Sequence, residues 1–237
     1  MSTSRAATVR AIETCGVVAV VRIDDPRSGL AVARALADGG VTSIEITMTV
    51  PSAVELIAEL SRTCADILIG AGTVTDAHTA RSVIDAGARF VVGPVFKPEI
   101  IAACHAHDVA VMPGCFSPTE IFAAWEMGAD VVKVFPATSL GPDYFKDLRG
   151  PLPQLRLMPT GGVTCDNAGA WIRAGAIAVG AGSALVDSKA LAARNFDVIT
   201  ENARQFMAAV RNARSEHPEA GFGRPVAVSL GGPSEAT

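Results

Sequence analysis

Residues 129–135 read ADVVKVF, a short run in which Lys133 interrupts the apolar residues Val131, Val132, Val134 and Phe135. It is one of eight such runs, and the other seven are GVVAVV (16–21), VTSIEI (41–46), ADILIG (65–70), ARFVVG (88–93), DVAVMP (108–113), LRLMP (155–159) and AIAVG (176–180). Runs that stay apolar, instead of alternating with polar residues, are typical of strands that are buried on both faces of a parallel sheet. The sequence therefore predicts eight buried parallel strands.

The segments between most of these runs have the Ala- and Leu-rich pattern of amphipathic helices. The clearest start signal is residues 117–120, SPTE, with a serine N-cap, a proline in the first turn and an acidic residue three positions after the cap. Glycine-containing turns, such as residues 86–88, end other helices and lead into the next run. Eight strand–helix units predict an α/β fold of the single (β/α)₈ TIM-barrel type. A doubly wound open sheet is the alternative, because periodicity does not establish closure.

The predicted barrel occupies residues 1–212. Residues 213–237 are rich in Gly, Pro and Ser, and we expect a tail that is loosely ordered or packed on the surface.

The net charge is −4 and the basic residues are scattered, so no nucleic-acid partner is expected. No apolar run approaches the roughly 18 residues of a membrane span, so no membrane partner is expected either. The five cysteines lack a CxxC pair, which favours free thiols in the cytoplasm over disulfides or a zinc site.

Two charged residues stand in the C-terminal halves of predicted strands: Glu45 in the second and Lys133 in the sixth. Catalytic groups of barrels lie at the C-terminal ends of the strands. A buried amine either loses its proton or pairs with a carboxylate, and an unprotonated lysine is a nucleophile for carbonyl carbon. The pair therefore predicts Schiff-base chemistry in which the carboxylate moves protons. The alternative is that both side chains simply reach water at a strand end.

Glycine turns follow the last two predicted strands. These are Thr160-Gly161-Gly162 and Gly182-Ser183. Backbone amides at these positions of a barrel, together with a helix N-terminus, commonly hold phosphate, although such glycines can also be plain tight turns. Together with a lysine on the sixth strand, they predict a phosphorylated carbonyl compound as the substrate.

The order of these motifs resembles that of the 2-keto-3-deoxy-6-phosphogluconate (KDPG) and 4-hydroxy-2-oxoglutarate (KHG) aldolase family. The resemblance spans roughly residues 10–212 and is carried by IEIT (44–47), GAGTV (70–74), Gly93-Pro94, VVKVFPA (131–137), LGPDYFK (140–146), MPTGGV (158–163) and GSALV (182–186). It implies a class I aldolase on a (β/α)₈ barrel, commonly a homotrimer, that uses no metal or other cofactor. The implied reaction cleaves KDPG to pyruvate and glyceraldehyde 3-phosphate, with KHG cleavage to pyruvate and glyoxylate as a second activity.

The resemblance also assigns roles to individual residues. Lys133 would form the iminium and Glu45 would act as general acid and base. The implied substrate-binding residues are Thr73 for the pyruvate carboxylate, Pro94 and Phe135 for the pyruvoyl pocket, and the glycine turns with Ser183 for the phosphate.

One position departs from the family pattern. Gluconate-type members carry a carboxylate-binding arginine four residues after the glutamate, where this chain has Thr49. Arg22 ends the first predicted strand, as in the related 2-keto-3-deoxy-6-phosphogalactonate (KDPGal) aldolases and in other gluconate-type members. A guanidinium can pair with a carboxylate through two hydrogen bonds, so we expect Arg22 to supply the missing contact.

The sequence leaves several alternative functions open. A KDPGal aldolase is the nearest alternative, because the two substrates differ only at C4. A metal-dependent pyruvate aldolase would need a set of acidic and histidine ligands at the strand ends, which offer one carboxylate and no histidine. A non-catalytic phosphosugar-binding barrel needs no nucleophile. An isomerase or a thiamine phosphate synthase does not require a lysine in the sixth strand.

Overall fold

Each of the eight predicted runs contains a strand in the computed structural model, which describes residues 4–216. A ninth, two-residue strand follows the fifth run. The strands are β1 Val17–Val21, β2 Ser43–Thr47, β3 Leu68–Gly72, β4 Phe90–Val92, β5 Ala110–Met112, β6 Gly114–Cys115, β7 Val132–Val134, β8 Leu157–Pro159 and β9 Val179–Ala181. The prediction of buried strands is confirmed, because nearly every residue of these segments is shielded from solvent.

Helices alternate with the strands, as the sequence predicts. They are α1 Arg5–Cys15, α2 Gly29–Asp38, α3 Ala53–Thr63, α4 Ala77–Asp85, α5 Pro98–His105, α6 Pro118–Glu126, α7 Asp143–Arg149, α8 Cys165–Arg173, α9 Ser188–Ala192 and α10 Phe196–Glu216, with 3₁₀ turns η1 Pro26–Ser28 and η2 Ala137–Ser139. The predicted start of α6 is confirmed: Ser117 and Glu120 form a reciprocal capping box.

All strand pairs are parallel, but the ladders form two sheets. One has the order β5-β4-β3-β2-β1-β9 and the other β6-β7-β8. Pro113, which has no N–H to donate, separates β5 from β6. A single bridge, Thr160 to Gly180, links the end of β8 to β9. The chain therefore has an α/β fold with a curled parallel sheet, in place of the one continuous eight-stranded sheet that an ideal barrel would have.

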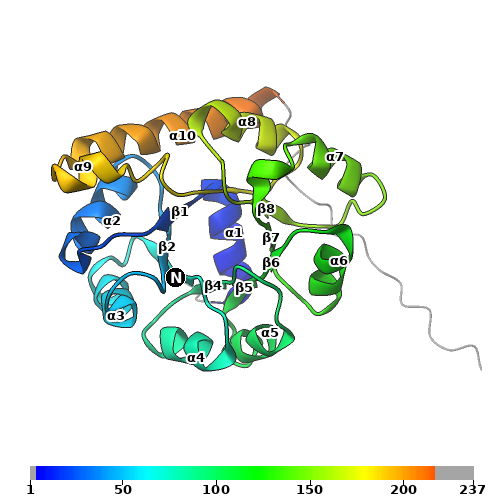
Figure 1. The fold of residues 1–237 in the computed structure, drawn as a ribbon, viewed down its shortest axis with the longest axis horizontal. Helices are drawn as coiled ribbons and strands as arrows, with labels where there is room; N and C mark the ends of the chain where they lie inside the picture. The colour runs from blue at the N-terminus through cyan, green and yellow to red at the C-terminus, as the bar shows by residue number, and fades with distance from the viewer. Residues whose placement is uncertain (1–3, 217–237) are drawn as a thin grey trace, which may run out of the picture.

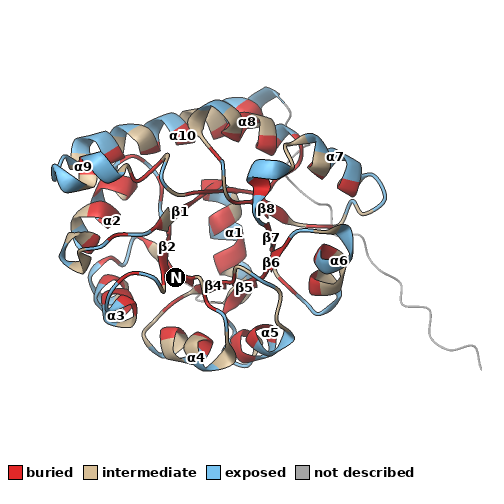
Figure 2. Ribbon diagram, viewed as in Figure 1, coloured by how far each residue is buried: buried red, intermediate tan, exposed pale blue. Residues whose placement is uncertain are grey.

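The helices surround the strands (Figure 1), and buried residues lie on the inner side of the helices and along the strands (Figure 2). Two apolar clusters result. The larger lies between strands and helices. The smaller collects strand side chains such as Phe90, Met112 and Met158 together with Val9 and Ile12 of α1. Because α1 contacts β1, β2 and β5, this helix packs against the interior apolar cluster.

The last helix extends past the expected domain boundary. α10 continues to Glu216, and the boundary after residue 212 falls inside it. Ala213 is fully buried, and Arg214 donates hydrogen bonds to the carbonyl oxygens of Thr14 (2.9 Å) and Ile177 (3.1 Å). Residues 213–216 thus belong to the packed fold. The rest of the predicted tail lies outside the described residues. Within residues 4–216, no helix has the length and apolar character needed to cross a membrane.

Candidate active site

A cavity of about 580 Å³ lies at the C-terminal ends of the strands. Its wall includes the predicted nucleophile and carboxylate and all nine predicted substrate-binding residues. These residues are Lys133, Glu45, Arg22, Thr73, Pro94, Phe135, Thr160, Gly161, Gly162, Gly182 and Ser183. The fold therefore brings together the whole set, although its members are spread over more than 160 positions of sequence.

Lys133 occupies the middle of β7, between Val132 and Val134. Those two valines belong to the apolar cluster under the helices. Because successive side chains of a strand point to opposite faces, Lys133 points away from the helices and into the cavity. Its side chain is only 5% exposed, and its Nζ lies 5.0 Å from the ring centroid of Phe135. The alternative that this lysine merely reaches water at a strand end is therefore not favoured.

Glu45 reaches the cavity by the same alternation. It lies in β2 between Ile44 and Ile46, both packed under the helices, and is 1% exposed. Neither carboxylate oxygen has a hydrogen-bond partner among the described residues. Burial raises the pKa of Glu45 above its ordinary value, while the positive charges of Lys133 and Arg22 act in the opposite direction. A raised pKa makes the carboxylate a stronger base, which suits a group that must accept a proton in general acid–base catalysis.

Space for this carboxylate is provided by Gly72, the last residue of β3, which pairs with Thr47 of β2. A β-carbon at Gly72 would overlap the Glu45 carboxylate and would lie 2.5 Å from its Cγ. The glycine is therefore required by the close approach of the glutamate side chain. The sequence analysis assigned no role to Gly72.

Thr73 follows this glycine in a left-handed conformation, with φ +60°. That conformation is uncommon for β-branched residues and persists only where the surrounding structure imposes it. Such strained residues are concentrated at functional sites. Thr73 lines the cavity beside the carboxylate of Glu45, in the region where the sequence predicts contact with the substrate.

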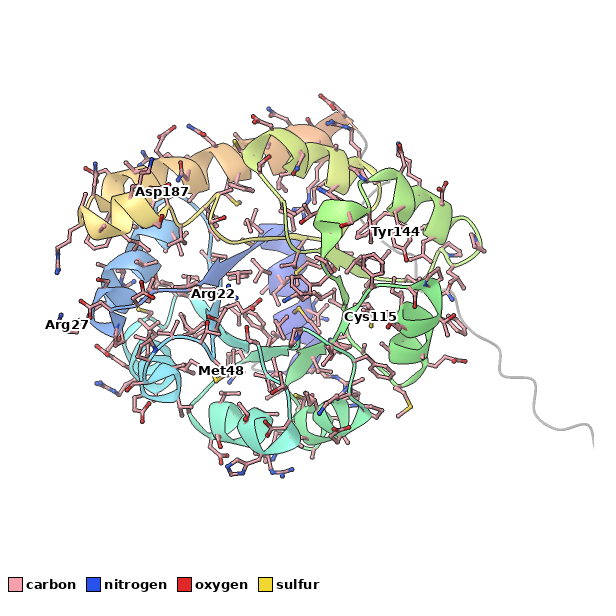
Figure 3. All side chains as sticks on the ribbon, in the orientation of Figure 1. Arg22, Arg27, Met48, Cys115, Tyr144 and Asp187 are labelled. Atoms are coloured by element: carbon pink, nitrogen blue, oxygen red, sulfur yellow. The ribbon has the colours of Figure 1, made fainter. Side chains whose placement is uncertain are left out.

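Thr49, the position that departs from the family pattern, is in direct contact with Arg22. The Nε–H of Arg22 donates a hydrogen bond of 3.1 Å to the hydroxyl oxygen of Thr49. Figure 3 places Arg22 within the ring of helices, whereas Arg27 of the same loop lies at the outer edge of the molecule. Arg27 forms a two-pronged ion pair with Asp25. Only the first of these two arginines lines the cavity.

Another part of the cavity wall is built from glycine turns. Gly161 and Gly162 have φ values of +93° and +72°, which favour glycine. The nearby Thr160 hydroxyl is buried and has no partner among the described residues. Helix α8 begins directly after these turns, and its Asn167 donates a hydrogen bond to the carbonyl oxygen of Gly162 (2.9 Å). Glycine turns before a helix N-terminus form an arrangement that binds anions.

The cavity also has wall residues that the sequence analysis did not identify. They are Val20, Val163, Thr164, Gly180, Ala184, Val186, Ser188 and Leu191. Several come from the short helix α9 and the turn before it. A five-residue helix carries too little periodicity to be recognised in a sequence. Among residues 4–216, no group of three or more His, Cys, Asp or Glu side chains is placed to hold a metal ion.

A buried lysine and a buried carboxylate at the ends of parallel strands, facing an anion-binding turn, define a site for carbon–carbon bond chemistry through a Schiff base. Residues 9–202 match the family model described as KDPG and KHG aldolase, and the chain belongs to this family.

Two relatives and one solved structure illustrate the similarity. The 2-dehydro-3-deoxy-phosphogluconate aldolase of Treponema pallidum (strain Nichols) is 37% identical over 82% of this chain and 93% of its own length. The 2-dehydro-3-deoxy-6-phosphogalactonate aldolase of Escherichia coli (strain K12) is 33% identical over 83% and 95%. The crystal structure of the KDPG aldolase from Legionella pneumophila, with pyruvate captured at low pH as a covalent carbinolamine, superposes with a TM-score of 0.78. It is 31% identical and the match covers 83% of this chain and 96% of that one.

Proposed function

We propose that this protein is a class I aldolase that cleaves KDPG to pyruvate and D-glyceraldehyde 3-phosphate. The observation that carries the proposal is the presence of Lys133 and Glu45, both almost fully buried, in one cavity with the glycine turns. The family supplies the reaction class. The relative from Treponema pallidum is named for the gluconate substrate, which favours KDPG over the alternatives.

In the proposed mechanism, the unprotonated amine of Lys133 adds to the C2 carbonyl of the substrate and gives a carbinolamine. Loss of water then forms an iminium. Glu45 accepts the proton of the C4 hydroxyl, and the C3–C4 bond breaks as C4 becomes the aldehyde carbon. The bonding electrons move to the iminium nitrogen and form an enamine. Protonation at C3 and hydrolysis release pyruvate and regenerate the amine.

Glu45 is suited to carry these protons because it has no competing partner in the described protein. A carboxylate that is already saturated with hydrogen bonds would be a poorer base. In this scheme, the raised pKa also lets the same group return a proton during carbinolamine formation and hydrolysis. The iminium serves as the electron sink, so this mechanism requires no metal.

Substrate binding is proposed to divide the cavity into two ends. Arg22 and Thr73 would hold the carboxylate of the substrate, and Pro94 and Phe135 would line the pyruvoyl pocket. The phosphate would be bound at the other end by Gly161, Gly162, Gly182 and Ser183, near Thr160 and the N-terminus of α8. Backbone N–H groups and the helix dipole are appropriate ligands for such a dianion.

KDPGal aldolase is the second candidate. It is favoured by Arg22, which occupies the position typical of that group, and by the similarity to the galactonate enzyme of Escherichia coli. Pyruvate release from purified KDPG and from its C4 epimer decides between the two. We expect the higher kcat/KM for KDPG and no release by Lys133→Ala. A preference for the epimer would favour the second candidate, and absence of release from both would contradict the aldolase proposal. Unphosphorylated KHG belongs in the same comparison, as a second substrate.

We further propose that the two sheets act as one closed (β/α)₈ barrel in a single domain. The direct succession of β5 and β6 and the Thr160–Gly180 bridge support closure. A homotrimer and a cytoplasmic location are also proposed. The first rests on family resemblance, and sedimentation equilibrium tests it. The second is supported by the five cysteines, all of which are free thiols.

A further inference from the structure

A chain of three hydrogen bonds joins the ends of β1 and β2 beside the cavity. Arg22 Nε lies 3.1 Å from the Thr49 hydroxyl, which lies 2.7 Å from the Thr47 hydroxyl. The Thr47 hydroxyl in turn lies 3.2 Å from the carbonyl oxygen of Val21. Val21 directly precedes Arg22, so the chain starts and finishes at neighbouring residues and ties the arginine side chain to its own strand.

The direction of each of these three hydrogen bonds is fixed by the two groups at the ends of the series, the Arg22 guanidinium and the Val21 carbonyl oxygen. A carbonyl oxygen only accepts, so the single hydroxyl proton of Thr47 is used on Val21. The Thr49 hydroxyl must therefore donate to Thr47. Its own oxygen remains free to accept from Arg22, which has donors only. Each of the three hydrogen bonds thus has one donor and one acceptor: Arg22 donates to Thr49, Thr49 to Thr47, and Thr47 to the Val21 carbonyl oxygen.

The two threonines differ in their surroundings. Thr47 is fully buried in β2, whereas Thr49, which follows the strand, is exposed. A single exposed hydrogen bond would hold a long side chain weakly. Here the exposed Thr49 hydroxyl is oriented by its hydrogen bond to the buried Thr47 hydroxyl. The Thr49 oxygen is therefore held with a lone pair directed toward Arg22.

We propose that Thr49 is a positioning residue, which acts through Arg22 and fixes the guanidinium for end-on binding of the substrate carboxylate. The inference rests on the proposed function of the cavity. With Nε engaged by Thr49, the edge formed by the two Nη atoms keeps all four of its N–H groups. Neither Nη atom has a hydrogen bond or ion pair within residues 4–216. Such an edge can grip a carboxylate with two parallel hydrogen bonds.

Position 49 thereby has a function that differs from that of the arginine found there in gluconate-type relatives. In this protein the cation is Arg22, which directly follows β1, and Thr49 supports it through a hydrogen bond. A second consequence concerns Glu45, whose negative charge Arg22 favours from the end of the neighbouring strand. A guanidinium released from Thr49 would lose part of this effect, so the acid limb of the pH–rate profile would move to higher pH.

The test is the dependence of borohydride trapping on pyruvate concentration. The variants are Thr49→Val, which keeps the shape but lacks the hydroxyl, Thr49→Ser, which restores it, Arg22→Ala, and the double variant Arg22→Ala/Thr49→Val. Arg27→Ala is the matched arginine control, because Arg27 lies outside the cavity. Hydroxyacetone, a ketone without a carboxylate, serves as the second probe, and melting temperatures report on folding.

We expect Thr49→Val to raise the half-saturating pyruvate concentration by about three- to tenfold, the effect of losing one ordinary hydrogen bond, because the Arg22–Thr49 bond is exposed. Trapping at saturating pyruvate, trapping by hydroxyacetone and the melting temperature should stay as in the wild type. Thr49→Ser should recover pyruvate affinity to within about twofold. On the Arg22→Ala background, Thr49→Val should add nothing, since its effect passes through the arginine.

Some results overturn the inference on Thr49 while leaving the aldolase proposal intact. One is weaker pyruvate binding in Arg22→Ala but wild-type binding in Thr49→Val. Another is a loss in Thr49→Val that adds in full to that of Arg22→Ala, or that appears equally with hydroxyacetone. Unchanged binding in Arg22→Ala removes the contact that Thr49 would support, and overturns the inference as well. If the wild type is not trapped at all, the proposed function fails and the inference fails with it.

Discussion

Replacing Gly72 by alanine is expected to displace the Glu45 carboxylate while leaving Lys133 in place. The added β-carbon would overlap the carboxylate and would lie 2.5 Å from Glu45 Cγ, whereas ordinary contacts between such atoms are about 3.5–4.0 Å apart. The atoms in conflict belong to a flexible side chain that borders an open cavity, so the side chain can turn aside and the strand pairing can survive.

The size of the effect follows from that geometry. Cγ must move by about 1 Å to reach ordinary contact distance, and the carboxylate at its end moves further. A misplacement of this size can cost about 100-fold in rate. At about 1.36 kcal/mol for each factor of ten, this corresponds to about 2.7 kcal/mol of lost transition-state stabilisation. The loss should appear in kcat, because Glu45 acts during bond cleavage.

Two assays separate this effect from a general loss of structure. Pyruvate release from KDPG should fall about 100-fold, whereas the melting temperature should stay near that of the wild type. Pyruvate that is added at saturating concentration should still be trapped on Lys133. Gly150→Ala is the matched control, because that glycine ends α7 with φ −53°, outside the cavity, and a β-carbon there meets only Asp147 O at 3.4 Å and Lys146 O at 3.9 Å.

If Gly72→Ala cleaves KDPG within about threefold of the wild-type rate, the proposed displacement of the Glu45 carboxylate does not limit the reaction. Glu45 would then either tolerate displacement or have no part in the chemistry. Loss of cleavage together with a collapse of the melting temperature would instead mean that the strand pair, and not the carboxylate, bears the cost.

Three further predictions follow from the same structure. Burial raises the pKa of Glu45. As pH rises, the unfolded chain therefore releases the proton of the Glu45 carboxyl group near pH 4.5, whereas the folded protein still holds it. The free energy of unfolding consequently falls as pH rises through the raised pKa. The difference in melting temperature between Glu45→Gln and the wild type should therefore shift in favour of the variant as pH rises from about 4.5 through the raised pKa, and should stay constant above it. A difference that is the same at every pH would contradict the assignment. Burial raises the pKa of Cys115 to about 12, so iodoacetamide at pH 8 should alkylate the half-buried Cys165 well before Cys115 in the folded protein, as peptide mapping can establish. Ser117→Ala breaks the capping box of α6 and should lower the free energy of unfolding by about 1 kcal/mol, with cleavage unchanged; an unchanged thermal or denaturant midpoint would show that the cap adds no stability.

The strands could be predicted because burial on both faces leaves a strong record in composition. In β7, for example, Val132 and Val134 must face apolar helices, so the run stays apolar and Lys133 stands out. The break in the ladder at Pro113 was not predicted, since a proline at the end of an apolar run looks like the end of a strand. The packing of α1 against the interior strand cluster was also missed, because contacts distant in sequence leave no local pattern.

The site was predictable to the extent that chemistry demands particular residue types. A lysine and a glutamate inside apolar runs are costly unless they have a function, and this cost made Lys133 and Glu45 visible. Supporting residues carry no such signal. Gly72 matters only because the Glu45 side chain crosses above it, which depends on the register of β2 and β3. Thr49 was noticed as an arginine that is missing, and its contact with Arg22 required the geometry of two strand ends.

The central claim is that Lys133 is the nucleophile, and borohydride trapping with pyruvate tests it most directly. The protein is treated with a large excess of pyruvate and reductant in the presence of a chelator, then analysed by intact mass and peptide mapping. We expect one stable adduct, located on Lys133, which is lost in Lys133→Ala and retained in Glu45→Gln. A folded protein that forms no adduct, or forms it on another lysine, would contradict the mechanism and leave a phosphosugar-binding barrel as the reading to test.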